Sequence, residues 1–336
     1  MKATAIAPAN IAFIKYWGKA DDALRLPLNS SISMNLSGCV TTTTVEFSPS
    51  YREDIVEFMD QKALTIFSRS REDCQSESLR VCNHLDSVRA RAGSAWHARV
   101  VTKNSFPKGA GIASSASGFA ALTVAAVEAL GLTLSEKELT IIARLGSGSA
   151  CRSIPDGFVE WQKGKNSQTS FAYSLYPENH WDLRDIVVVV QKSQKKIGST
   201  EGMDGIRTSP FLGKRIRNIP DRIKEIKHAL ARKDIEFLGA LMEEDCINMH
   251  AVAMTQKPPI YYWNGTTMDI IRSVCDWRMQ GIPAYFTIDA GPNVHLICEA
   301  KDEKIVSKKV SEIIGVQQII VNKPAQGAHV INNHLF

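Results

Sequence analysis

The stretch Pro107–Leu130, PKGAGIASSASGFAALTVAAVEAL, joins a glycine- and serine-rich loop directly to an apolar, alanine-rich helix that ends at Gly131. A helix N-terminus carries unpaired N–H donors and a partial positive charge, which together favour phosphate binding. The loop lacks the Gly-Lys-Ser/Thr of a Walker A motif and the GxGxxG dinucleotide fingerprint. Taken alone, the stretch fits a serine-capped core helix equally well. The residues that would contact a phosphate are Gly109, Gly111, Ser114, Ser115 and Ser117.

Three further segments of the sequence help to decide between these two interpretations. They are APANIAFIKYWGKADDALRLPLNSSISMNL (Ala7–Leu36), GSGSACRSIPDGFVEW (Gly146–Trp161) and YFTIDAGPNVHLI (Tyr285–Ile297). With GAGIASSASG they resemble the mevalonate diphosphate decarboxylases, a branch of the GHMP small-molecule kinase superfamily. The motifs KYWGK, SGSACRS and DAGPN stand in the order of that family, and the resemblance extends over essentially the whole chain. Four motifs in the right order are far more specific than any one of them.

Composition narrows the class of protein. The chain has 336 residues, 44% of them hydrophobic and 22% charged, as in ordinary globular proteins. Its formal net charge is only +5 and the basic residues are scattered, so nucleic acid is a poor candidate partner. Seven cysteines without a CxxC pair indicate neither a zinc site nor a disulfide framework. No segment has the length and apolarity of a membrane span or a signal peptide, so we expect a cytoplasmic protein.

Strand-like and helical patterns alternate along both halves of the chain. The predicted strands lie at 2–7, 31–36, 41–47, 96–102, 158–161, 170–175, 186–191, 284–288, 294–299 and 317–321. The predicted helices lie at 76–92, 114–130, 135–145, 214–232, 233–250, 265–280 and from 302 onward. Ser135 and Glu138 have the spacing of a capping box. A loop after Pro8 is expected to carry Lys15–Lys19.

This interleaving gives an α+β fold. The resemblance implies the two-lobed GHMP kinase fold, with the active site in the cleft between the lobes. We expect an N-terminal lobe over residues 1–183, which contains the phosphate-binding loop, and a C-terminal lobe over 184–336.

Asp289 stands on a tight turn, directly after a predicted strand and before Gly291-Pro292. An isolated aspartate at such a place is often only a turn former. The resemblance implies instead that it faces the C3 hydroxyl of the substrate and is required for catalysis. It also implies that Lys15, within KYWGK, lies close to this carboxylate, where a cation would keep Asp289 ionised and offset phosphoryl charge.

Arg152 of SGSACRS is implied to bind the C1 carboxylate of mevalonate, because a guanidinium matches a carboxylate with two parallel hydrogen bonds. Trp17 is expected to serve packing. The other residues that the resemblance assigns to the substrate, chiefly to its phosphates, are Tyr16, Lys19, Ser147, Ser149 and Ser199.

The implied reaction is an ATP-dependent decarboxylation. ATP phosphorylates the 3-hydroxyl, and loss of that phosphate together with CO₂ leaves an alkene. Ser114, Ser115 and Ser117 are implied to contact ATP, and Mg²⁺ is expected to bridge its phosphates, with Ser115 as the candidate protein ligand. The adenine site is expected only loosely, within residues 60–105.

Two departures from the family bear on the substrate. Pro155-Asp156-Gly157 replaces the Gly-Gly pair of many bacterial relatives, and Glu201 stands beside Thr200 in the phosphate-binding segment KKIGSTEGM. A glutamate near the terminal phosphate would disfavour a diphosphate by ~1–4 kcal/mol. Mevalonate 5-diphosphate is the family's substrate, and mevalonate 5-phosphate, the substrate of phosphomevalonate decarboxylases, is a nearly equal alternative.

Two other classes of function compete with a decarboxylase. A kinase could phosphorylate the 3-hydroxyl and stop, but such relatives depart from the family at the positions of Asp289, Lys15 and Arg152. A non-catalytic binding or scaffold protein would be expected to have lost its phosphate loop or its aspartate. The resemblance also implies a homodimer.

Overall fold

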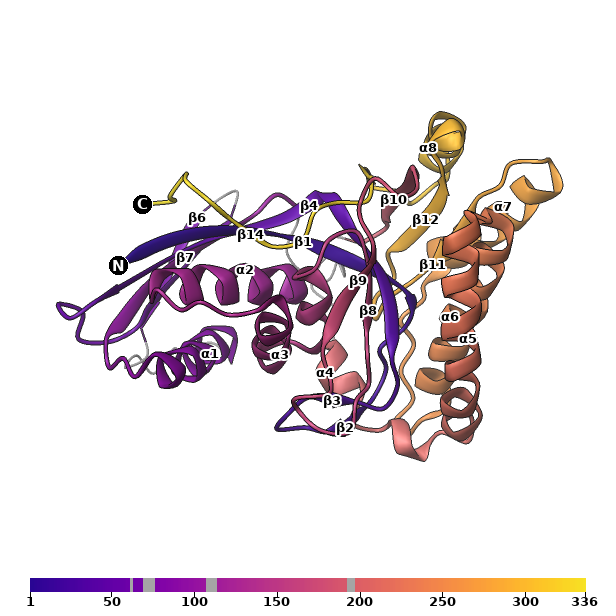
Figure 1. Ribbon diagram of the computed structural model, residues 1–336. Coiled ribbons are helices and arrows are strands. Elements are labelled where there is room, and N and C mark those ends of the chain that lie inside the picture. The colour runs from indigo at the N-terminus through magenta and orange to yellow at the C-terminus, as the bar shows by residue number, and fades with distance from the viewer. Residues whose placement is uncertain (61–62, 69–75, 107–113, 192–196) are drawn as a thin grey trace.

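Two β-sheets, each covered by helices, give the chain its two lobes (Figure 1). The computed structural model describes residues 1–60, 63–68, 76–106, 114–191 and 197–336. The eight-stranded sheet belongs mainly to the first half of the chain, and the four-stranded sheet to the second. The fold is therefore α+β, as predicted.

The eight-stranded sheet has the order β14-β1-β4-β7-β5-β6, and β8 extends from β4 with β9 beside it. Neighbouring strands are antiparallel except β5 and β7, which run parallel. Its strands are β1 (Lys2–Ile14), β4 (Ser31–Ser48), β5 (Ile55–Asp60), β6 (Ala63–Ser68), β7 (His97–Asn104), β8 (Phe158–Trp161), β9 (Ala172–Tyr176) and β14 (His329–Ile331). A small hairpin of β2 (Lys19–Asp21) and β3 (Leu26–Pro27) follows β1.

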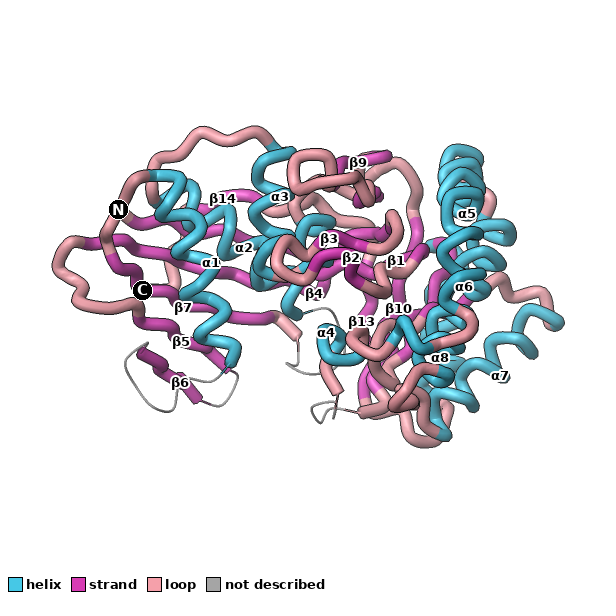
Figure 2. Tube along the Cα trace, turned by 90° about the horizontal axis from the view of Figure 1, so that it is seen from below, coloured by secondary structure: helices cyan, strands magenta, loops and turns pink. Residues whose placement is uncertain are grey.

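Three helices cover one face of this sheet: α1 (Ser76–Ala92), α2 (Ser114–Ala129) and α3 (Glu136–Gly146), as Figure 2 shows from below. Their apolar side chains share a core with Ala3, Ala5 and Ala7 of β1. The capping box of α3 is confirmed, because Ser135 and Glu138 each accept from the other's backbone N–H. A 3₁₀ turn, η1 (Gly148–Ser153), follows α3 and carries the SGSACRS motif.

The four-stranded sheet has the order β11-β12-β10-β13, all antiparallel. One of its faces packs on α7 and α8, and the other packs on α5 and the distal part of β1. Its strands are β10 (Leu183–Val189), β11 (Tyr285–Thr287), β12 (Val294–Glu299) and β13 (Gln318–Asn322). The helices of this half are α4 (Ser199–Gly202), α5 (Leu212–Arg232), α6 (Ile235–Thr255), α7 (Gly265–Met279) and α8 (Glu303–Ser311), with short 3₁₀ turns η2 (Ile206–Thr208) and η3 (Ala300–Asp302).

The long strand β1 belongs to both lobes, which the sequence did not predict. The expected loop after Pro8 is wrong, because the strand continues to Ile14. The register with β4 shifts between Pro8 and Ala9, and such an irregularity accommodates a residue without a backbone N–H. Beyond it, Ile11 and Phe13 enter the core of the second lobe. The end of β1 thus reaches the junction of the lobes.

Other differences are local. Residues 31–36 and 41–47 form one continuous strand, β4, rather than two. The strands β5, β6 and β14 and the short helix α4 were not predicted. Strand β14 returns from the C-terminal end to pair with β1 in the first sheet. No helix in the described parts of the chain is long and apolar enough to cross a membrane.

Candidate active site

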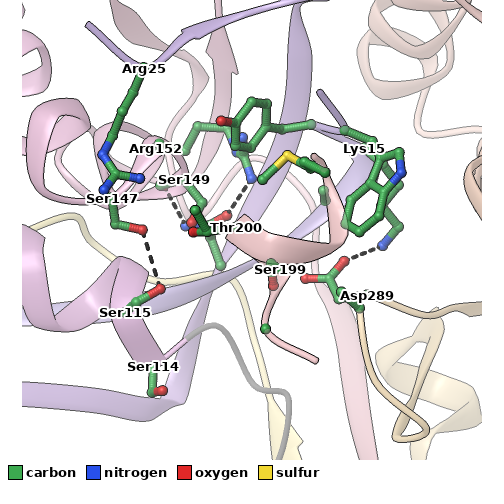
Figure 3. A pocket seen from close by; sticks show the side chains of 18 of the residues that line it. Lys15, Arg25, Ser114, Ser115, Ser147, Ser149, Arg152, Ser199, Thr200 and Asp289 are labelled. Atoms are coloured by element: carbon green, nitrogen blue, oxygen red, sulfur yellow. Dashed lines mark hydrogen bonds and ion pairs between the residues drawn. The ribbon is translucent and has the colours of Figure 1, made fainter. Parts of the chain in front are cut away.

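A cavity of about 430 Å³ lies where the two lobes meet, and residues from both line it (Figure 3). A volume of this size is typical of small-molecule sites. The cavity brings together nine of the residues predicted from sequence: Lys15, Tyr16, Ser114, Ser115, Ser147, Ser149, Arg152, Ser199 and Asp289.

Lys15 and Asp289 form an ion pair at one end of the cavity. Lys15 follows β1 and Asp289 follows β11, and the Lys15 Nζ lies 2.6 Å from the Asp289 Oδ1. Burial raises the pKa of Asp289, but the charge of Lys15, supported by His295 and Arg152, outweighs it and holds that pKa below its ordinary value. The carboxylate is therefore ionised at neutral pH and faces the cavity beside a buried ammonium.

Arg152 is buried, yet it has no carboxylate partner among the described residues. Its Nε donates to Ser33 Oγ at 3.0 Å, its Nη1 to Ser31 Oγ at 2.7 Å and its Nη2 to Asn10 Oδ1 at 3.1 Å. A guanidinium has five N–H groups, so one remains on each terminal nitrogen. Burial lowers the pKa of Arg152, but an arginine stays charged. An uncompensated buried cation at a cavity wall calls for an anionic ligand.

The serines of α2 and of the turn after α3 meet in the middle of the cavity. Ser115 Oγ and Ser147 Oγ are 3.2 Å apart. The backbone of Gly148 approaches the ring of Tyr16 so closely that a Cβ at this position would lie 2.7 Å from Tyr16 Cε1. Only glycine fits there, which explains the small-residue run of SGSACRS.

Two arginines that the sequence analysis did not single out, Arg25 and Arg80, line the cavity together with Glu77. Arg25 Nε donates to the carbonyl oxygen of Leu145 at 2.9 Å, and Arg80 Nη2 donates to that of Gly146 at 2.9 Å. Neither guanidinium has an ion-pair partner among the described residues. Burial lowers the pKa of Arg80, and the neighbouring charge of Arg25 lowers it further. This end of the cavity is therefore cationic.

The short helix α4 forms the opposite wall, where Ser199, Thr200 and Glu201 line the cavity. All three are exposed. Burial raises the pKa of Tyr262 to about 12, and the charge of Glu201 adds to this effect. Glu201 therefore carries its charge at the cavity rim, close to Tyr262.

Several predicted residues lie elsewhere. Lys19 pairs with Asp22 and Asp204 and does not line the cavity. Ser117 lies on the buried face of α2, toward β4, and its Oγ is 2.7 Å from Thr41 Oγ1. Asp156 also lies away from the cavity and accepts from the backbone N–H of Gly327 at 2.7 Å, which anchors the returning C-terminal segment. Gly109 and Gly111 lie outside the described residues. Trp17 is buried and packs edge-to-face on Tyr262, as expected, and it also lines the cavity.

Sequence reasoning missed part of the lining: Asn10 and Arg25 lie within the quoted segment Ala7–Leu36 but outside its KYWGK motif, and Arg80 lies outside all four segments. Arg25 lies in the β2–β3 hairpin that follows KYWGK, and Arg80 stands one helical turn after Glu77 on α1. A helix with an acidic and a basic residue at this spacing usually presents a solvated face. Asn10 lies within β1 and was hidden by the expectation of a loop.

The side chains that line the cavity are better suited to bind magnesium together with nucleotide phosphates than to hold a metal ion by themselves. No group of three or more His, Cys, Asp or Glu side chains is gathered as a metal site in the described parts of the chain. Magnesium keeps several waters and is typically bound through substrate phosphates with few protein ligands. The exposed hydroxyl of Ser115 and the nearby cations Arg25, Arg80 and Lys15 suit such a phosphate complex.

Comparisons with known proteins identify the family of the chain. The profile of the diphosphomevalonate decarboxylase-like N-terminal domain matches residues 7–172, and that of the mevalonate 5-diphosphate decarboxylase C-terminal domain matches residues 185–333. The chain belongs to the diphosphomevalonate decarboxylase family.

Members of this family resemble the chain over nearly its whole length. The diphosphomevalonate decarboxylase of Candida albicans is 38% identical over 91% of this chain and 86% of its own. The crystal structure of mevalonate diphosphate decarboxylase from Staphylococcus aureus superposes with a TM-score of 0.91 at 38% identity, covering 98% of each chain. A complex of the protein MDDEF with MVAPP, AMPPCP and magnesium superposes with a TM-score of 0.89 at 36% identity, covering 99% of each chain.

Replacing Lys15 with methionine tests the electrostatics of this decarboxylase-family site. Without the ammonium, burial dominates, and the pKa of Asp289 is expected to rise above that of the native protein. Titration of ¹³C-labelled aspartate by NMR, with Asp289→Asn to assign the signal, measures this shift. Lys19→Met is the matched control, since Lys19 pairs with other carboxylates. An unchanged titration of Asp289 in Lys15→Met would contradict the assigned cause.

Proposed function

We propose that the protein is an ATP- and Mg²⁺-dependent decarboxylase that converts mevalonate 5-diphosphate to isopentenyl diphosphate, CO₂, ADP and phosphate in isoprenoid biosynthesis. Relatives that match most of the chain carry this activity in their names, and a related solved structure holds MVAPP, AMPPCP and magnesium. The observation that carries the proposal is the convergence of an ionised carboxylate, a buried ammonium and a buried guanidinium without a carboxylate partner among the described residues.

Asp289 is proposed to orient the C3 hydroxyl and to accept its proton. A carboxylate with a lowered pKa is a weak base toward a free alcohol, so it acts as an acceptor that becomes effective as the oxygen–phosphorus bond forms and the hydroxyl grows more acidic. Lys15 keeps Asp289 ionised and offsets charge on the transferring group. Bound ATP supplies the phosphoryl group, and Mg²⁺ offsets the charge of its phosphates.

Arg152 is proposed to hold the C1 carboxylate through its two remaining terminal N–H groups. The adjacent Ser31, Ser33 and Asn10 fix the guanidinium plane, so the carboxylate is placed before the reaction begins. When the 3-phosphate leaves, positive charge builds at C3, and the C1–C2 bond electrons form the alkene as CO₂ departs. The buried Lys15 and Arg152 keep both leaving groups in an electrostatically favourable setting.

The phosphorylated end of the substrate is proposed to lie toward Ser147, Ser149 and Tyr16, with Arg25 and Arg80 beyond them. Two guanidinium groups without a carboxylate partner among the described residues supply the charge that a diphosphate needs. Lys19 and Ser199 are also proposed to contact substrate, and Ser114, Ser115, Ser117, Gly109 and Gly111 to contact ATP, with Ser115 near the metal. For Lys19 this requires the ammonium to leave Asp22 and Asp204.

We also propose that the protein forms a homodimer, that it is cytoplasmic, and that the N-terminal lobe ends at residue 183 and the C-terminal lobe begins at residue 184. Sedimentation equilibrium measures the first of these.

Parallel assays with mevalonate 5-diphosphate and mevalonate 5-phosphate test the proposed function. ADP, CO₂ and alkene are scored together, and the diphosphate is expected to react faster. ADP without CO₂ would identify a kinase, and no turnover of either substrate would identify a binding protein. A faster reaction of the monophosphate would make the protein a phosphomevalonate decarboxylase.

Asp289→Asn is expected to lower turnover by about 10²–10⁴-fold, because the amide keeps the shape but cannot accept the proton. ATP binding, measured by calorimetry, is expected to persist. A near-normal rate would remove Asp289 from the mechanism.

Arg152→Lys is expected to raise the KM for the mevalonate substrate and leave that for ATP unchanged, because lysine cannot form the two parallel hydrogen bonds to a carboxylate. Steady-state kinetics with each substrate varied in turn measures both constants. A rise confined to the KM for ATP would show that the assignment to the carboxylate is wrong.

Glu201→Gln is expected to raise kcat/KM for the diphosphate relative to the monophosphate, because it removes a negative charge at the cavity rim. The change should weaken at high salt, since the Debye length is ~8–10 Å at physiological ionic strength. Glu225→Gln, on the exposed face of α5, is the matched control. An unaltered ratio at every ionic strength would mean that Glu201 does not sense the substrate.

A further inference from the structure

Helix α6 contacts the backbone on both sides of the catalytic pair. It packs against β1, β11 and β12 (Figure 1). Lys15 directly follows β1, and Asp289 closely follows β11. Lys15 and Asp289 belong to segments 274 residues apart in sequence. Something other than the ion pair must therefore set their separation.

On the Lys15 side, α6 contributes Asp245, which is fully buried. Its Oδ2 accepts from the backbone N–H of Lys15 at 2.7 Å. Arg215 of α5 donates to both Asp245 oxygens, at 2.9 and 3.1 Å, and to the carbonyl oxygen of Lys15 at 3.1 Å. Asn29 donates to the same carbonyl at 3.0 Å. Both peptide groups that flank the Lys15 side chain are thus held by buried groups.

On the Asp289 side, α6 contributes Cys246 and His250, one helical turn apart. The Cys246 Sγ accepts from the N–H of Ile288 at 3.2 Å, and its S–H faces the Ile288 carbonyl oxygen at 3.6 Å. His250 Nε2 lies 3.2 Å from that carbonyl. Burial lowers the pKa of His250 to about 3, so the ring is neutral and its proton lies on Nε2, the only nitrogen that faces this acceptor.

We propose that α6 is the positioning element of the reaction, in which Asp245 holds the backbone of Lys15 while Cys246 and His250 hold the residue before Asp289. None of these three side chains lines the cavity, so they act on the reaction through Lys15 and Asp289. Because one rigid helix supplies both attachments, the ammonium and the carboxylate stay at hydrogen-bonding distance in a cavity that must exchange substrate and product. This inference rests on the proposed decarboxylase function.

Cys246 offers a cleaner test than Asp245. Asp245→Asn leaves the buried guanidinium of Arg215 without its carboxylate and is expected to destabilise the whole fold. Cys246→Ala removes one small side chain, and Cys246→Ser restores a donor and an acceptor at the same place. Cys298→Ala is the matched control, because Cys298 is equally buried but lies on β12 opposite Arg184 of β10.

Two readouts separate positioning from stability. Cys246→Ala is expected to lower kcat about five- to tenfold, with KM changed less than about twofold, because the reacting groups and not the binding groups lose alignment. It is also expected to move the NMR titration of Asp289 to higher pH. The charged groups that lower the pKa of this carboxylate are Lys15, His295 and Arg152, and the freed Asp289 segment moves away from Lys15, the strongest of them. Cys246→Ser should restore both values.

Cys298→Ala is expected to lower the melting temperature as Cys246→Ala does, while kcat and the Asp289 titration stay native. If Cys246→Ala behaves like Cys298→Ala in kcat and titration, α6 is only a structural helix and the inference is wrong. The Asp289 titration needs no turnover, so it reports on positioning even if the wild-type protein releases no CO₂, which would overturn the proposed function alone.

Discussion

The ion pair between Lys15 and Asp289 is the constraint around which the two lobes are arranged. Placing an ammonium where only 3% of its side chain is exposed costs several kcal/mol unless a partner is held in good geometry. The partner comes from the far half of the sequence, on a turn that follows β11. The end of β1 must therefore stay docked on the second lobe, and the apolar packing of Ile11 and Phe13 in that lobe's core keeps it there.

Buried arginines in this molecule differ in how their charge is balanced and in whether they face the cavity. Arg89 forms two hydrogen bonds with the carboxylate of Asp54 within the first lobe, and Arg215 does the same with Asp245. Arg152 is just as buried but is surrounded by neutral acceptors and faces the cavity. Arg144 is also fully buried among neutral acceptors, but it does not line the cavity. What distinguishes Arg152 is that its charge, balanced by no carboxylate among the described residues, can reach an anionic ligand in the cavity.

The sequence predicted what depends on local chemistry. The capping box of α3 follows from Ser135 and Glu138, and β8 begins and ends where its residues indicated. Prediction from the sequence failed where tertiary contacts override local signals. Pro8 indicated the end of a strand, but a register shift against β4 lets the strand continue. Strand β14 has only three residues, and pairing with β1 determines it more than its own composition does.

The residues of the site likewise divide into those that local sequence reveals and those that only the tertiary fold brings to the cavity. Motifs located Lys15, Arg152 and Asp289, whose chemistry is tied to their neighbours in the sequence. They could not locate Arg25 or Arg80, which reach the cavity only because a hairpin and α1 fold over the end of α3. Nor could they show that Ser117 lies beneath its helix, since a serine at a helix start can point either way.

The two ends of the cavity are formed by different kinds of structural element. The end that holds the ion pair consists of strand termini held by buried side chains of α5 and α6, so a small backbone shift there changes the distance between Lys15 and Asp289. The cationic end consists of the β2–β3 hairpin and the first turns of α1, and the short helix α4 with Glu201 lies exposed on the opposite wall. Residues at that end can change without disturbing the ion pair. Discrimination between a monophosphate and a diphosphate can therefore vary among proteins that share the same chemistry.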